Sequence, residues 1–226
     1  NLIPDCATKG GGMTSKPFPS LLAAQRVEHA AAFQNGSLPR CLDLTLSEAL
    51  VLGLLRQGVR TFFVVFGHGS TEIGEVLRIY AAQGILRVFG LRSEIEASHA
   101  AAALRWVRGE KAAVVTSIGP GALQALAASL APASDGLGVW YLFGDETSED
   151  EGYNMQQIPR REQGLFLQLA STMGHAYSLH TPLALSTALA RAAAAVDHPY
   201  RPSPFYLLLP MNTQAAWLEG FNLDEL

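Results

Sequence analysis

The sequence predicts an α/β protein, a three-layer α/β/α sandwich around a parallel sheet of six strands. Six short apolar runs alternate with stretches of helical periodicity along the chain. The runs lack the polar alternation of half-exposed strands, so we expect helices to cover both faces of the sheet. With 226 residues, 49% of them hydrophobic and 16% charged, the chain can fill one sizeable core.

The N-terminal part, residues 1–43, is predicted to be an arm that contains one helix. Residues 18–33 place apolar side chains at helical spacing, and Asn35 and Gly36 are a typical helix end. We expect this helix to precede the main domain.

The main domain is predicted to span residues 44–214 and to open with a helix. Thr45 is the expected N-cap of this helix, and Glu48, three residues later, completes a capping box. The predicted strands are residues 61–66, 86–89, 112–116, 139–143, 175–179 and 205–209. Residues 215–226 form a C-terminal tail with no core of its own, which must dock on this domain or on a partner.

Composition excludes several classes of function. The net charge of −4 offers no basic surface, so neither nucleic acid nor an anionic membrane is expected as a partner. No signal peptide and no long apolar span is visible. Cys6 and Cys41 have neither metal spacing nor the density of a disulfide scaffold, which fits a reducing cytosol. We therefore expect a soluble cytoplasmic protein.

Glu94 is the first candidate functional residue. It lies where the strand at residues 86–89 gives way to a helix, at the sheet edge where α/β proteins bind ligands. The alternative is that the acid serves the helix macrodipole, an effect of ~0.3–1 kcal/mol. Glu96 is expected to point away from Glu94, and His99 is expected to be a packed, hydrogen-bonded histidine.

Two glycine-rich turns follow other strands. Gly119, Pro120 and Gly121 open a helix, but Pro120 removes an amide donor, so we favour close approach of a backbone or a flat ring over phosphate binding. His68 lies between glycines after residues 61–66, where it can either exchange protons or cap a helix. The acidic loop at residues 146–162 is a candidate active-site or interface loop. Local spacing predicts no metal site.

Together these residues resemble the pyrimidine-binding domain of thiamine-diphosphate-dependent enzymes of the acetolactate synthase and pyruvate decarboxylase type. The resemblance covers residues 44–214. The spellings FGHG, TSIGPGA and QQI are especially similar to the trihydroxycyclohexanedione hydrolase branch, which opens a cyclic diketone. The matching segments are Arg92-Ser93-Glu94, Ala97-Ser98-His99, TSIGPG at residues 116–121, FGHG at residues 66–69 and QQI at residues 156–158.

The resemblance implies a thiamine-diphosphate-binding fold of the pyrimidine-domain type and a role for each motif. Glu94 would hydrogen-bond N1′ of the cofactor's aminopyrimidine and favour the imino tautomer, which generates the reactive ylide. His68 would carry protons for substrate intermediates, and Gln157 would face the substrate. The residues implied to line the pyrimidine are Ser117, Gly119, Pro120 and Gly121.

Departures from the family pattern leave the substrate open. Ser93 replaces a histidine, and Glu96 replaces a common glycine. The family holds the diphosphate through Mg²⁺ in a second domain marked by GDG and a later Asn, whereas this chain has GDE at residues 144–146. The resemblance therefore implies a partner subunit that holds Mg²⁺, in a heterodimer or heterotetramer.

The first hypothesis is the pyrimidine-domain subunit of a split thiamine-diphosphate enzyme, a lyase or transferase active only with its partner. It would act on a 2-oxo acid or diketone by decarboxylation and carboligation, as acetolactate synthase does. The alternatives are hydrolytic cleavage of a carbon–carbon bond in a cyclic 1,2-diketone, a non-catalytic subunit, and a fragment of a full-length enzyme.

Overall fold

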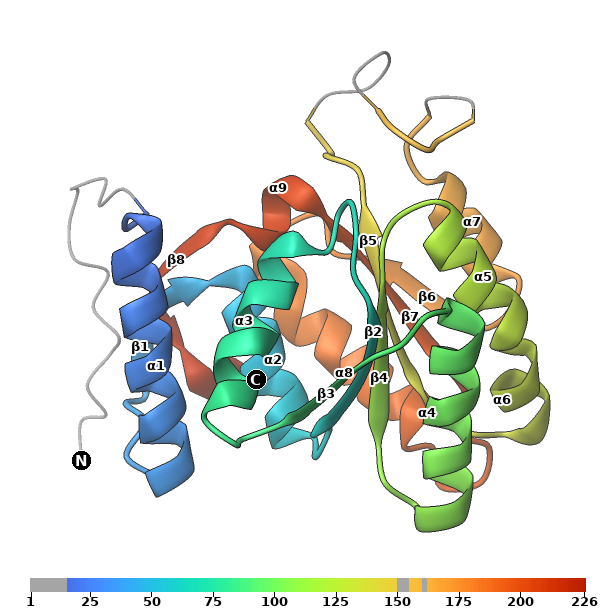
Figure 1. Cartoon of the computed structure of the whole chain (residues 1–226), viewed down its shortest axis with the longest axis horizontal. Helices are drawn as coiled ribbons and strands as arrows, with labels where there is room; N and C mark the ends of the chain where they lie inside the picture. The colour runs from blue at the N-terminus through green and yellow to red at the C-terminus, as the bar shows by residue number, and fades with distance from the viewer. Residues whose placement is uncertain (1–15, 150–154, 160–161) are drawn as a thin grey trace.

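The computed structural model describes residues 16–149, 155–159 and 162–226, and it confirms the predicted fold class (Figure 1). Six parallel strands form one sheet in the order β3-β2-β4-β5-β7-β6. These strands are β2 Thr61–Val65, β3 Arg87–Gly90, β4 Ala112–Thr116, β5 Trp140–Asp145, β6 His175–Ser178 and β7 Phe205–Pro210. Each overlaps one of the apolar runs that predicted it.

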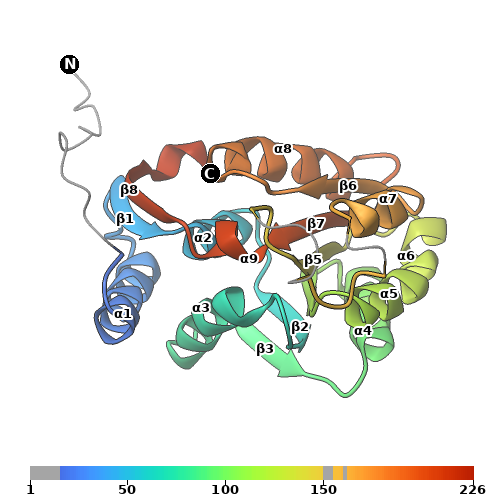
Figure 2. The same cartoon turned by 90° about the horizontal axis from the view of Figure 1, so that it is seen from above.

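Helices cover both faces of this sheet (Figure 2). One face carries α2 Leu46–Arg56, α3 Thr71–Ala82 and α8 Leu185–Val196. The other carries α4 Glu94–Arg108, α5 Pro120–Ala128, α6 Leu130–Asp135 and α7 Leu165–Ser171. Along β4, Ala113 and Val115 join the first core while Ala112 and Val114 join the second. The first four residues of this strand are therefore all apolar, because both of its faces are buried.

The direction of the connections reverses between β2 and β4, which are neighbours in the sheet. The chain leaves β2 for α3 on one face, whereas it leaves β4 for α5 on the other face. The two loops diverge at the carboxyl ends of the strands, and a reversal of this kind is where open α/β sheets bind their ligands. The turn with His68 and the turn with Gly119 to Gly121 both lie at this point.

A second, two-stranded sheet was not predicted. β1 Cys41–Thr45 pairs antiparallel with β8 Trp217–Asn222, so the predicted arm and tail meet. The tail thus docks on this chain. In the sequence, β8 follows the short helix α9 Met211–Gln214 and precedes the short helix η2 Leu223–Glu225. Cys41 is disulfide-bonded, a bond that the cysteine pattern did not predict. Cys6 lies outside the described residues.

The arm helix, α1 Pro19–Asn35, packs against α3 and is anchored by a buried charge pair. Arg26 Nε lies 4.0 Å from Glu48 Oε2, and both side chains are almost inaccessible to solvent. Arg26 also donates to the Thr45 hydroxyl (3.0 Å) and to the Glu72 carboxylate (2.8 Å). Through Arg26, α1 therefore contacts both α2, by way of Thr45 and Glu48, and α3, by way of Glu72.

The capping box predicted at Thr45 is only half present. Thr45 Oγ1 accepts from the Glu48 amide (3.4 Å), as an N-cap should. The Glu48 carboxylate does not return to the cap. Its Oε1 instead accepts from the Tyr80 hydroxyl (2.9 Å) and lies 3.0 Å from His29 Nδ1. Glu48 is fully buried, so its carboxylate takes buried partners, with Arg26 Nε 4.0 Å from its Oε2, because an unpaired buried charge is costly.

Within the described part of the chain, no helix combines the length and the apolar character needed to cross a lipid bilayer.

Candidate active site

Glu94 is the first residue of α4, directly after the loop that leaves β3. Ser93 is its N-cap, with an extended backbone and a hydroxyl that accepts from the Ile95 amide (3.2 Å). This cap explains why serine fits at the position where the family that the sequence resembles has a histidine. Only 8% of Glu94 is exposed, and among the described residues no group donates a hydrogen bond to its carboxylate. An acid that served only the macrodipole would gain nothing from such withdrawal from solvent, because the dipole acts equally on an exposed side chain in the first turn.

The Glu94 carboxylate lies against the first turn of α5. A Cβ atom added to Gly121 would stand 2.8 Å from Glu94 Oε1 and 2.5 Å from Ser117 Oγ. Only glycine therefore lets the carboxylate and the hydroxyl approach this backbone so closely. The structure thus brings together three of the residues that the sequence assigned to the cofactor.

Gln157 packs over the turn that precedes α5. Gly119 has φ +70°, and a Cβ atom there would stand 2.7 Å from the Gln157 Cβ. Gln157 itself has φ +59°, a left-handed conformation that is uncommon for a residue with a side chain and that is often found at functional sites. Pro120, the first residue of α5, is exposed and has no amide to donate. The turn is therefore shaped for a flat group or a backbone more than for a phosphate.

His68 lies on the turn after β2 and faces a buried acid. Its Nε2 stands 3.0 Å from Glu146 Oε1, with 31% of the histidine side chain and 2% of the glutamate side chain exposed. The His68 carbonyl accepts from the Ile118 amide (3.0 Å), which joins the His68 turn to the loop of Ser117. The predicted proton carrier and the predicted pyrimidine residues therefore belong to one connected site.

Two acids at the end of β5 were not assigned as site residues. Asp145 is 7% exposed, and burial raises the pKa of its carboxyl to about 6. The hydrogen bond that this carboxyl accepts from the Glu146 amide lowers its pKa, whereas the charge of Glu146 raises it. The end of β5 presses on the His68 turn, since a Cβ on Gly69 would lie 3.1 Å from Gly144 Cα. The sequence signal for these residues was the pair of adjacent acids at the end of a buried strand.

The comparison with family models identifies the chain. The model of the thiamine pyrophosphate enzyme, N-terminal TPP binding domain, matches residues 44–165, more than half of the sequence. The chain belongs to this family. The predicted resemblance is thereby confirmed at the level of the family, and the chain is a thiamine-diphosphate-binding domain of an enzyme. No curated protein matches the sequence.

Two other expectations for α4 of this thiamine pyrophosphate enzyme domain have different outcomes. Glu96 is exposed, and it does not join Glu94. His99, expected to be packed and hydrogen-bonded, is exposed, so this interpretation is wrong. His99 lies on the outer face of α4. The alanine-rich sequence of this helix did not show which of its faces is exposed.

The domain presents an apolar outer surface on α4 and α5, beside Glu94. Trp106 is 74% exposed, and other large apolar side chains line the same two helices. We call this set the α4–α5 surface; it comprises Ile95, Trp106 and Val107 on α4 and Leu123 on α5, with Leu130 at the start of α6. Large apolar side chains exposed on neighbouring helices are candidates for contact with another domain.

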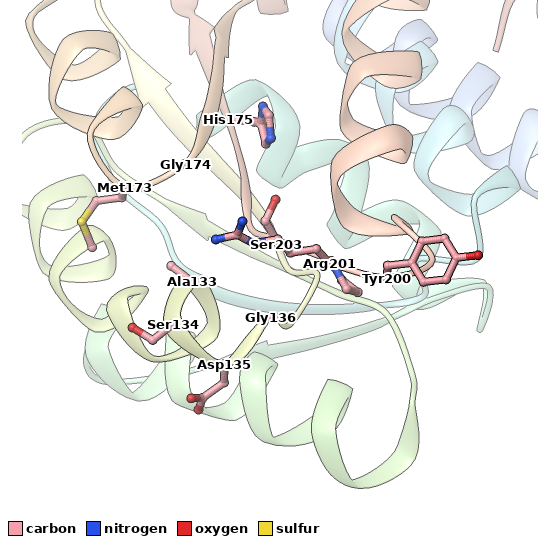
Figure 3. Close-up of a pocket in the computed structure, with 11 residues that line it drawn as sticks. Ala133, Ser134, Asp135, Gly136, Met173, Gly174, His175, Tyr200, Arg201 and Ser203 are labelled. Atoms are coloured by element: carbon pink, nitrogen blue, oxygen red, sulfur yellow. The ribbon is translucent and has the colours of Figure 1, made fainter.

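A pocket of about 520 Å³ lies at the opposite end of the strands, where their amino ends are (Figure 3). Its lining residues include Gly136, His175 and Ser203, which lie at or before the amino ends of β5, β6 and β7. None of the residues that the sequence assigned to the site lines it. We therefore locate the candidate active site at the carboxyl edge.

The described residues 16–149, 155–159 and 162–226 contain no group of three or more His, Cys, Asp or Glu side chains placed to hold a metal ion. Asp150 and Glu151 of the acidic loop lie outside these residues.

Proposed function

We propose that this chain is the pyrimidine-domain subunit of a heteromeric thiamine-diphosphate-dependent enzyme that acts on a 2-oxo acid or a diketone. The observation that carries the proposal is the Glu94 carboxylate, buried and without a donor among the described residues, against Gly121. A ring nitrogen of the cofactor's pyrimidine would supply the missing partner. When bound, thiamine diphosphate supplies a carbon nucleophile for attack on a carbonyl group.

The residues of this chain would bind and orient the pyrimidine half of the cofactor. Glu94 would share a proton with the ring nitrogen, and its burial makes that hydrogen bond strong and directed. Ser117, Gly119, Pro120 and Gly121 would line the ring, because the turn has little side-chain bulk. Gln157, which covers Gly119, would face the substrate.

A partner subunit would hold the diphosphate and Mg²⁺ and would cover the α4–α5 surface. The support is the position of that surface, which begins at Ile95, next to Glu94. A domain docked there would exclude water from the carboxylate. A heterodimer or heterotetramer is proposed; co-purification with a second chain supports it, and a longer native polypeptide, detected as a larger intact mass, refutes it.

The test compares Glu94→Gln with Glu96→Gln in the native assembly, supplied with thiamine diphosphate, Mg²⁺ and a panel of 2-oxo acids. Both variants remove one negative charge from the first turn of α4, but only Glu94 is buried in the site. We expect Glu94→Gln to lose turnover by about 100-fold or more, as for removal of a proton-transfer group. Glu96→Gln should keep it. Equal turnover in the two variants would refute the catalytic assignment and favour a non-catalytic subunit.

A second candidate reaction is hydrolytic cleavage of a cyclic 1,2-diketone. The observation that favours it is the His68–Glu146 contact, because a histidine backed by a carboxylate can deprotonate water. Turnover in ¹⁸O-labelled water distinguishes the two reactions. Incorporation of the label into a carboxylic acid product supports hydrolysis, and carboligation products without the label support the acetolactate synthase-like reaction.

A cytoplasmic location is also proposed, and fractionation of native cells checks it. Recovery of the chain in the cytoplasmic fraction supports this location, and recovery in a secreted or membrane fraction contradicts it.

A further inference from the structure

A buried carboxylate stands behind His68 at the carboxyl edge of the sheet. Glu146 Oε1 lies 3.0 Å from His68 Nε2, and only 2% of the Glu146 side chain is exposed. Most ion pairs of this kind lie at the surface, where they contribute little. Here the acid is withdrawn from water while its histidine remains accessible, an arrangement typical of a base and the group that orients it.

Glu146 is itself held in place from two sides. Its Oε1 accepts from the Gln156 amide (2.8 Å), and its own amide donates to Asp145 Oδ1 (3.0 Å). It directly follows β5, a fully buried strand. The carboxylate is therefore a rigid acceptor, as a supporting group around a functional side chain must be.

The contact is not needed to hold the His68 turn against the sheet. Gln214 Nε2 donates to the Gly69 carbonyl (2.6 Å) and to the Leu209 carbonyl (2.7 Å), which ties the turn to β7. The backbone of Gly69 also packs directly on Gly144. A purely structural role for the His68–Glu146 pair would duplicate these contacts.

We propose that Glu146 is a positioning residue that holds His68 in the tautomer with the proton on Nε2. This inference rests on the proposed function, in which His68 carries protons for the substrate. An ionised carboxylate only accepts hydrogen bonds, so the nitrogen that faces it must carry the proton. Nδ1 is then the atom that takes a proton from a substrate hydroxyl or water and returns it, while the Nε2 proton stays in the bond to Glu146.

The tautomer can be measured on the full chain without cofactor or partner. Long-range ¹H–¹⁵N correlation spectra of ¹⁵N-histidine-labelled protein, with His68→Gln to assign the signal, distinguish Nε2–H from Nδ1–H at a pH where the ring is neutral. We expect the wild type to show Nε2–H. Glu146→Ala should show both tautomers in exchange, and Glu146→Gln should keep Nε2–H because its amide oxygen still accepts. Glu149→Ala, in the same loop and without contact to His68, is the matched control.

In the assembled enzyme, Glu146→Ala should lower kcat by about 10- to 100-fold and leave KM within about twofold, with partial rescue in Glu146→Gln. A wild-type spectrum with the proton on Nδ1 would overturn the inference, even if Glu146→Ala failed to fold. So would an unchanged kcat in a folded Glu146→Ala variant. Failure of the proposed function would appear separately, as equal turnover of Glu94→Gln and Glu96→Gln, and would leave the tautomer measurement intact.

Discussion

Replacing Asp145 by Asn should stabilise the protein above about pH 6 and have little effect near pH 4. Burial raises the pKa of this carboxyl from an ordinary value of 3.8 to about 6, so the folded state binds more protons than the unfolded state between these values. Stability therefore falls as the pH rises through this window. A pKa difference of about 2 corresponds to about 3 kcal/mol, which is the upper limit of the effect.

Asparagine should fit the site because its side-chain oxygen can still accept from the Glu146 amide, as Asp145 Oδ1 does at 3.0 Å. Being uncharged, it avoids the cost of burying a carboxylate beside another acid. We expect the difference in unfolding free energy between the variant and the wild type to grow by about 2–3 kcal/mol from pH 4 to pH 7.

Urea unfolding of both proteins at half-unit steps of pH from 4 to 8 measures this difference. Asp135→Asn, which removes one exposed charge at the other edge of the sheet, is the control and should show no such growth. A flat difference across the pH range, or an Asp145→Asn variant less stable than the wild type at pH 7, would show that the burial argument is wrong.

Three further predictions concern the site and its surroundings. Gly121→Ala should lower turnover of the assembled enzyme by about 100-fold with unchanged circular dichroism, because the new Cβ displaces Glu94; unchanged turnover would contradict this. Arg26→Ala should lower the urea-unfolding free energy by about 3–5 kcal/mol, because the buried Glu48 carboxylate would keep Tyr80 and His29 but lose the arginine charge beside it, and adding Glu48→Gln should recover part of the loss. Trp106→Ser should weaken binding of the partner subunit at least tenfold in calorimetry without lowering the melting temperature, and equal affinity would argue against the α4–α5 surface.

Much of the site could be predicted from the sequence because its motifs are local. Glu94 follows a strand and begins a helix, and the TSIGPG segment joins a strand to a helix one strand later. Parallel strands bring such ends to one edge, so their proximity follows from the fold class. The role of Glu146 could not be predicted in this way, because 78 residues separate it from His68 and no periodicity relates the two.

The sequence by itself determined the six strands, the helices between them and the edge at which Glu94 lies, because β-branched runs, helix caps and glycine turns act over a few neighbouring residues. Only the tertiary structure decided that β1 pairs with β8, that Glu48 turns from its cap to buried Arg26, and that Glu146 stands behind His68. Each of these choices depends on which polar groups are left without water when distant segments pack, and that cost arises only once the chain is folded.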